Sequence, residues 1–143
     1  VLPWGSDDRD PGLRGKAAFL ARLAEQAADW RRLRAESERL CVAGDFNQDL
    51  RPAGHYYGST DGRAALRSAL AEAGLVCLTG GADDPLAGSP GLACIDHICV
   101  CGLRAVGEAR SSVCPRPGGL HRGLTDHYCV WADVEPGEPI RAG

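Results

Sequence analysis

The sequence predicts an α/β domain of the α+β type, with a mixed, mainly antiparallel sheet and helices on one face. Helix and strand patterns alternate through the first half of the chain, and the last third is strand-like with little helix between the strands. The length of 143 residues suits one ordinary domain. We expect a single domain over 1–143, with a frayed tail over 136–143.

Two segments have the pattern of amphipathic helices. Residues 13–35 repeat apolar side chains at helical spacing, and Arg, Asp and Glu occupy much of the rest. A second helix is expected to begin at a capping residue, Ser59, Thr60 or Asp61, and to end before Gly74, which suits a left-handed C-terminal position. Gly, Pro and other turn-forming residues predict loops at 5–12, 48–60 and 80–92.

Five segments have the pattern of strands. Residues 40–43 and 75–78 are short, fully apolar runs and are expected to be buried strands. Residues 93–101, 104–114 and 127–135 are longer strand-like segments that Gly and Pro clusters separate.

Charge and hydropathy limit the possible partners. The formal net charge of −3 argues against a broad basic surface for non-specific nucleic-acid binding, although a local Arg-lined groove stays possible. No apolar run is long enough to span a bilayer and no signal-peptide layout is visible, which predicts a cytoplasmic location. The chain contains no Met and opens on VLPW, which resembles the end of a strand, so we expect a preceding N-terminal portion.

The seven cysteines do not have the spacing of a zinc site. Cys99 and Cys101 form one C-x-C pair, and no second pair follows it. Most of the thiols lie in apolar runs, which predicts reduced thiols packed in the core. These are Cys41, Cys77, Cys94, Cys99 and Cys129.

Candidate functional residues interrupt three of the apolar strands. The motifs are GDFN at 44–47, IDHI at 95–98 and TDHY at 125–128. Asp45 and Asn47 are each compatible with a simple turn after a strand. A carboxylate inside an apolar strand, as in IDHI, is unfavourable unless a partner or a metal compensates it.

Structural interpretations also exist for the second and third motifs. Strand alternation places Asp96 and His97 on opposite faces, and His97 shares its face with Ile95 and Cys99, which favours a packing histidine. The Thr-Asp pair at 125–126 can be a cap or a turn. A purely structural origin for all three motifs together is less expected than a structural origin for any one of them.

Together, GDFN, IDHI and TDHY resemble the endonuclease/exonuclease/phosphatase superfamily, the DNase I-like proteins, in their order and rough spacing, with Thr125 in place of the usual Ser. The resemblance covers about residues 38–135. It implies hydrolysis of phosphodiesters or phosphomonoesters by metal-assisted attack of water, with Mg²⁺ or Mn²⁺ as cofactor. The implied substrate is a phosphate ester, possibly a nucleic acid.

The resemblance also implies a role for each motif residue. Asp45 would bind the metal and orient or deprotonate the attacking water, and Asn47 would contact a phosphate oxygen or that water. His127 would contact the phosphoryl oxygens, with Asp96 holding its ring and raising its basicity. Asp126 would belong to the metal site.

Two loops offer further candidate substrate contacts. His55 and Tyr57 belong to an aromatic cluster after GDFN, where a substrate group could stack, although packing on a sheet edge explains them equally well. Arg122 could contact a phosphate, although an exposed loop charge is the simpler interpretation.

The chain also departs from the family pattern. The resemblance implies a metal-binding Glu from the first half of the domain, and Glu25, Glu36 and Glu38 do not match it. The chain therefore resembles the second half of the four-layer α/β sandwich, and the N-terminal half is expected to complete the site. The alternatives are an inactive fragment or degenerate paralogue that keeps the fold for packing or binding, and a Cys/His transition-metal protein, which the spacings do not support.

Overall fold

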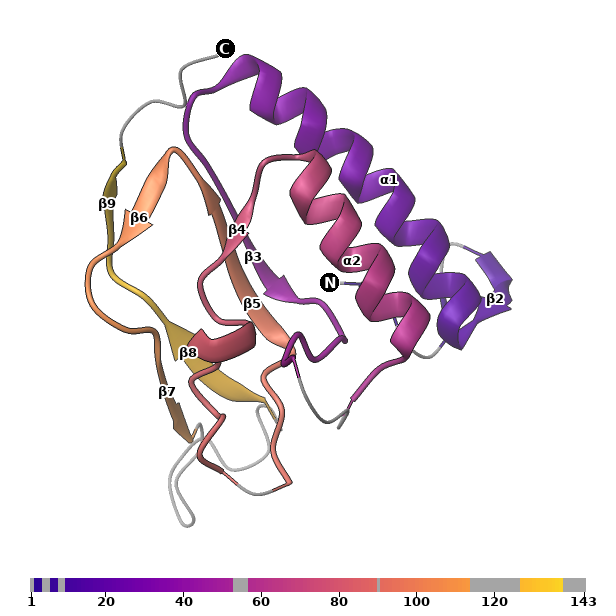
Figure 1. Cartoon of the computed structure of the whole chain (residues 1–143). Coiled ribbons are helices and arrows are strands. Elements are labelled where there is room, and N and C mark those ends of the chain that lie inside the picture. The colour runs from indigo at the N-terminus through magenta and orange to yellow at the C-terminus, as the bar shows by residue number, and fades with distance from the viewer. Residues whose placement is uncertain are drawn as a thin grey trace, which may run out of the picture.

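The computed structural model describes residues 2–3, 6–7, 10–52, 57–89, 91–113 and 127–137. Two helices and short strands make up this part of the chain (Figure 1). In chain order the elements are β1 Ser6–Asp7, β2 Asp10–Arg14, α1 Gly15–Glu36, β3 Leu40–Asp45, α2 Thr60–Glu72, β4 Val76–Cys77, the 3-10 helix Gly81–Asp83, β5 Asp96–Cys101, β6 Leu103–Ala105, β7 Arg110–Val113, β8 Tyr128–Trp131 and β9 Val134–Pro136.

Both predicted helices are present. The hydroxyl of Ser59 accepts a hydrogen bond from the Gly62 amide and caps α2, as a capping residue at this place should. Gly74 follows the helix with φ of 65°, the left-handed conformation that glycine adopts most readily.

The central sheet has the strand order β3-β5-β4 and is antiparallel throughout. Helices α1 and α2 lie side by side on one face of it (Figure 1), where they bury a common apolar core. The predicted α+β class, with helices on one face of a mainly antiparallel sheet, is confirmed. The core side chains include Phe19, Leu23, Trp30, Leu66, Leu70, Cys99 and Cys101.

The strands of the last third are shorter than predicted. The segment 104–114 divides into β6 and β7 around Gly107, whose φ of 79° turns the chain. The segment 127–135 likewise contains two strands, β8 and the beginning of β9. Strand β6 pairs with β9, and β7 pairs with β8. The ends of these strands are therefore set by strand pairing and not by the local sequence pattern.

Two other expectations were wrong. The segment 5–12, predicted as a loop, contains part of the β1–β2 hairpin. The segments 40–43 and 75–78 were predicted to be buried strands, but Cys41 and Ala43 are exposed and Val76 is 63% exposed, because β3 and β4 are the two edge strands of the sheet. In the predicted tail 136–143, Pro136 still belongs to β9 and the Gly137 amide donates to the Gly102 carbonyl at 3.0 Å. Residues 138–143 lie outside the described residues.

The prediction of core thiols holds for only part of the set. All six cysteines in the described ranges are free thiols, and Cys94, Cys99 and Cys101 are buried. Cys41 and Cys129 are exposed, so for these two the prediction was wrong. An apolar run does not show which face of a strand a helix will cover.

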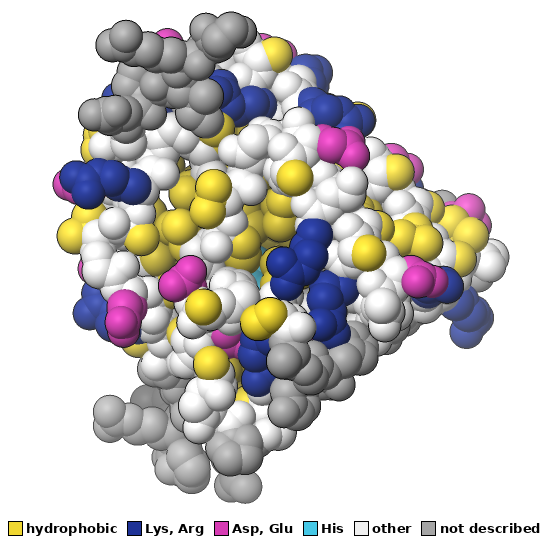
Figure 2. Space-filling view, in the orientation of Figure 1, with side chains coloured by type: hydrophobic (Ala, Val, Ile, Leu, Met, Phe, Trp, Pro, Cys, Tyr) yellow, Lys and Arg dark blue, Asp and Glu magenta, His cyan; other side chains and the backbone are white. Residues whose placement is uncertain are grey.

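The surface carries mixed charges. On the face shown in Figure 2, Lys and Arg side chains are interspersed with Asp and Glu, and hydrophobic side chains reach the surface between them. That distribution agrees with the small net charge of −3. None of the helices in the described part of the chain has the length and hydropathy to cross a membrane.

The link between β5 and β6 gives a first test of the fold. Gly102 has φ of +64°, and a Cβ there would overlap the backbone oxygen of Glu38. We expect Gly102→Ala to lower the free energy of unfolding by about 1–3 kcal/mol more than Gly107→Ala, measured by urea denaturation. Gly107 is the matched control, because it has a similar φ of +79° but open space around it. Equal losses in the two variants would show that the close approach of Glu38 is not maintained in solution.

Candidate active site

The register of β3 and β5 brings two carboxylates together. Asp45 and Asp96 are direct partners at the ends of their strands. The Phe46 amide donates to the Ile95 carbonyl at 2.8 Å, so the neighbouring pair is hydrogen-bonded and Asp45–Asp96 is a narrow, non-hydrogen-bonded pair. Their side chains therefore leave the sheet close to each other on the same face.

His127 joins these carboxylates from the start of β8. Its Nδ1 lies 2.6 Å from Oδ2 of Asp96, and both side chains are partly exposed. Ligand atoms of Asp45, Asp96 and His127 all lie within 4.8 Å of one another. The contact expected between Asp96 and His127 is thus present, and three segments distant in sequence converge on one place.

Asn47 lies directly against Asp45. It is buried and has a left-handed backbone with φ of 50°. Its backbone amide donates to Oδ1 of Asp45 at 2.8 Å, and its side-chain Nδ2 donates to Oδ2 of Asp45 at 2.8 Å and to the Leu2 carbonyl at 2.7 Å. These contacts engage the side-chain amide donor, so Asn47 orients Asp45 and can offer its own carbonyl oxygen to a water.

The electrostatics of the cluster favour a cation. Burial raises the pKa of Asp45, and the facing carboxylate of Asp96 raises it further, whereas the Asn47 amide and His127 oppose this shift. Two carboxylates and an imidazole form a donor set that suits a hard divalent ion such as Mg²⁺ or Mn²⁺. The residues present therefore fit the metal that the motifs imply.

A pocket of about 260 Å³ opens beside the cluster. Asp96 and His127 form part of its wall, and Tyr57 and Tyr128 add two phenol rings. No Lys or Arg is among the described residues that line it. The remaining wall is mostly apolar and includes Leu86, Leu92, Ala93, Cys94, Ile95 and Val130.

Three of the predicted site residues cannot be placed. Asp126, His55 and Arg122 lie outside the described residues. Tyr57 is described, is 40% exposed and borders the pocket.

His97 is a packing histidine, as the strand alternation predicted. It is 1% exposed, and its Nε2 lies 2.8 Å from the Gln48 carbonyl oxygen while its Nδ1 lies 3.1 Å from Oγ1 of Thr79. Burial alone would lower the pKa of His97, but hydrogen bonds with the thiols of Cys77 and Cys94 raise it to about 10.

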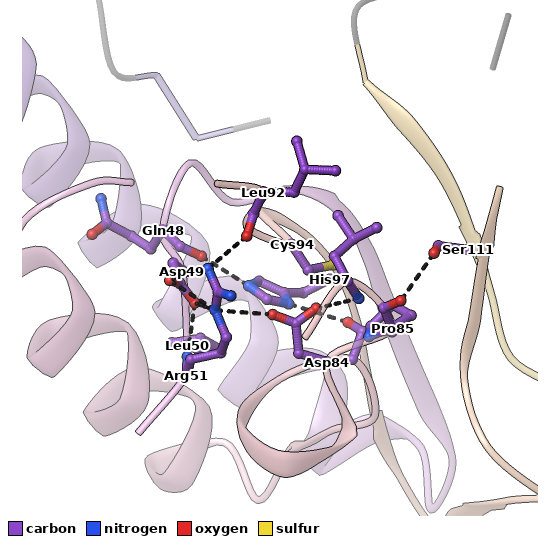
Figure 3. Close-up of polar contacts among 12 residues, drawn as sticks. Gln48, Asp49, Leu50, Arg51, Asp84, Pro85, Leu92, Cys94, His97 and Ser111 are labelled. Carbon is purple, nitrogen blue, oxygen red and sulfur yellow. Dashed lines mark hydrogen bonds and ion pairs between the residues drawn. The ribbon is translucent and has the colours of Figure 1, made fainter. Parts of the chain in front are cut away.

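Sequence reasoning missed a buried ionic network next to the site. Figure 3 shows Arg51 between Asp49 and Asp84. Its Nη2 lies 3.1 Å from Oδ2 of Asp49, and its Nε lies 3.2 Å from Oδ2 of Asp84. The Asp49 side chain is fully buried and that of Asp84 is 1% exposed. The only local signal was an Asp and an Arg directly after GDFN, in a segment predicted as a loop.

This network connects the elements that carry the three motifs. Arg51 also donates to the Leu92 carbonyl at 2.8 Å, and Leu92 lies on the segment that leads into β5 (Figure 3). The Ser111 hydroxyl donates to the Pro85 carbonyl at 3.1 Å and ties the same loop to β7, the partner of the β8 strand next to His127. Arg51 is therefore a structural support for the cluster rather than a member of it.

Comparison with known proteins agrees with the geometry. The model of the Endonuclease/Exonuclease/phosphatase family matches residues 4–127. Searches of curated proteins and of solved structures found no match. Members of the family are generally hydrolases that act on phosphate esters with divalent metal ions. Because the match covers most of its length, the chain belongs to the endonuclease/exonuclease/phosphatase family.

Proposed function

We propose that Asp45, Asp96 and His127 hydrolyse a phosphodiester or phosphomonoester by attack of water, with Mg²⁺ or Mn²⁺ as cofactor. The observation that carries this proposal is the convergence of the three groups, with ligand atoms within 4.8 Å of one another. Membership of the family supports the same class of reaction.

Asp45 is the residue that handles the attacking water. Burial, with the facing carboxylate of Asp96, raises the pKa of Asp45, and a raised pKa makes its carboxylate a better proton acceptor than that of an ordinary Asp. Both of its oxygens accept hydrogen bonds from Asn47, which fixes the direction of the carboxylate. The carbonyl oxygen of Asn47 is available to accept a hydrogen bond from the same water.

Asp45 and Asp96 would hold the cation, with Asp126 as a further ligand from the TDHY motif. When bound, the cation neutralises charge that develops on the phosphoryl group. The mutual repulsion of the two facing carboxylates favours its binding. The resemblance implies one more ligand, a Glu from the first half of the domain, which Glu25, Glu36 and Glu38 do not match.

His127 is the residue that contacts the phosphoryl oxygens. The hydrogen bond of 2.6 Å between its Nδ1 and Oδ2 of Asp96 fixes the orientation of the ring. A protonated ring donates from Nε2 to an oxygen that gains charge in the transition state. Asp96 therefore acts on the reaction partly through the orientation of His127.

The non-phosphate part of the substrate would occupy the pocket beside the cluster. Tyr57 would stack on a flat group there, and His55 and Arg122, which lie outside the described residues, are proposed as further substrate contacts. A nucleic acid fits this arrangement, because every base offers a face for stacking. The absence of Lys and Arg from the described pocket wall argues against a substrate with several additional phosphates.

The test is a phosphodiesterase assay on two proteins, the chain of residues 1–143 and an extended chain that adds the first half of the domain implied by the resemblance. We expect the extended chain to cleave bis(4-nitrophenyl) phosphate with Mg²⁺ or Mn²⁺ and to lose this activity with EDTA. The chain of residues 1–143 is expected to show little or no turnover, because none of its Glu residues matches the metal-binding Glu that the resemblance implies. Circular dichroism establishes that both proteins are folded.

Two results would contradict the proposal. Cleavage that persists in EDTA would exclude the metal-dependent reaction. A folded, extended chain that binds Mn²⁺ but cleaves neither phosphodiesters nor phosphomonoesters would favour a domain kept for packing or binding. Strong EDTA-sensitive turnover by the chain of residues 1–143 would instead show that the implied Glu ligand is dispensable.

A further inference from the structure

Two cysteines face each other in the central sheet, away from the candidate active site. Cys77 of the edge strand β4 is the direct antiparallel partner of Cys99 in β5 (strands shown in Figure 1). Both are free thiols. No other pair of cysteines is directly opposed in the strand pairings of the described residues.

The local hydrogen bonding makes this a close pair. The Leu78 amide donates to the Ile98 carbonyl at 2.8 Å, which identifies the neighbouring Leu78–Ile98 pair as hydrogen-bonded. Cys77 and Cys99 therefore form the narrow type of pair, in which the two Cα atoms are about 4.5 Å apart. A disulfide needs Cα atoms roughly 4.4–6.8 Å apart, so strands β4 and β5 need little movement to accept one.

The two thiols differ in access and in acidity. Cys77 is half-buried at the edge of the core, whereas Cys99 is fully buried. A hydrogen bond from the Cys99 thiol, helped by the neighbouring His97, lowers the pKa of Cys77, and the same contact raises the pKa of Cys99. Since the thiolate is the reactive form, Cys77 is suited to react first and Cys99 to react second.

We propose that Cys77 and Cys99 are a peroxide-reactive pair that closes into a reversible disulfide between β4 and β5. The Cys77 thiolate attacks hydrogen peroxide: an S–O bond forms, the O–O bond breaks, and hydroxide leaves and takes up a proton. The Cys99 thiol then loses its proton and attacks the Cys77 sulfur, so that an S–S bond forms and water leaves. Two thiols are oxidised and one peroxide is reduced to two waters.

The disulfide would close a ring around the loop that borders the active-site pocket. Leu86 and Leu92 lie between the two cysteines in sequence and line that pocket. β5 itself begins at Asp96. Oxidation therefore restrains the edge strand and the loop together, and it should raise the temperature of unfolding of the metal-free chain. Neither thiol belongs to the proposed metal and phosphate site, so this proposal stands independently of the catalytic one.

The experiment is limited oxidation of the reduced protein with hydrogen peroxide, followed by alkylation and peptide mapping. We expect a cross-linked peptide pair that contains Cys77 and Cys99, its loss on treatment with dithiothreitol, and a higher midpoint of thermal unfolding in the oxidised form. Cys99→Ser should stop the reaction at a Cys77 sulfenic acid that dimedone traps. Cys41→Ser is the matched control, because Cys41 is exposed on β3 and its removal should leave the cross-link unchanged.

Two results would overturn the proposal. One is a folded wild-type protein in which peroxide modifies Cys41 or Cys129 while Cys77 and Cys99 stay reduced. The other is a dimedone adduct at Cys77 that accumulates equally with and without Cys99. The mapping of the wild-type protein decides the matter even if a variant fails to fold.

Discussion

Asp45→Asn should lower kcat/KM for phosphodiester cleavage by the extended chain by about 10²–10⁴-fold, because it removes the proposed proton acceptor and a metal ligand together. Affinity for Mn²⁺, measured by titration calorimetry, should fall in parallel. Asp83→Asn is the matched control: Asp83 is an exposed carboxylate on the 3-10 helix, and both quantities should stay at the wild-type value.

The raised pKa of Asp45 adds a pH signature to this variant. Burial and the charge of Asp96 favour the protonated carboxyl of Asp45 in the folded chain. When the pH is lowered, the affinity for Mn²⁺ should therefore begin to fall at a higher pH than it would if Asp45 had the pKa of an ordinary Asp. In the metal-free protein the folded form binds the extra proton between the ordinary and the raised pKa, so stability falls as pH rises through that window. Asp45→Asn should remove both dependences. Wild-type Mn²⁺ affinity in this variant would show that Asp45 is a turn residue only.

The candidate site was largely predictable because its three motifs stand out against apolar strands. The carboxylate inside the apolar strand of IDHI needs compensation, and this need is visible in one sequence. The register that places Asp45 opposite Asp96 was not visible, because a pairing between distant strands depends on the whole sheet. The hydrogen bonds that Asn47 donates could not be predicted either, because one of the acceptors is the backbone carbonyl of Leu2, which is distant in sequence.

The fold shows the same division between local and distant causes. The helix α2 was predictable because its cap, its apolar stripe and Gly74 all lie within one segment. The ends of β6 and β8 were not, because they depend on where the partner strands lie. Exposure of Cys41 and Cys129 could not be predicted either, because it depends on which sheet face the helices cover.

The ionic network around Arg51 was missed for a related reason. A charged residue in a loop is usually solvated, and here the loops themselves are packed together. Asp49 and Asp84 are buried carboxylates that lie far apart in sequence and share one guanidinium. Removal of Arg51 would take its guanidinium away from the two buried carboxylates of Asp49 and Asp84. The loss of a partner from a buried charge is strongly unfavourable.

We expect Arg51→Ala to lower the free energy of unfolding by about 3–5 kcal/mol, measured by urea denaturation of the metal-free chain. Asp49→Asn with Asp84→Asn in the same background should recover part of this loss, because it removes the buried charges themselves. Arg31→Ala is the control: its partner Glu72 is 58% exposed, and its loss should stay within about 1 kcal/mol. If Arg51→Ala were as mild as this control, the network would not hold the loop, and the positions of Asp96 and His127 would have to depend on the strand pairings alone.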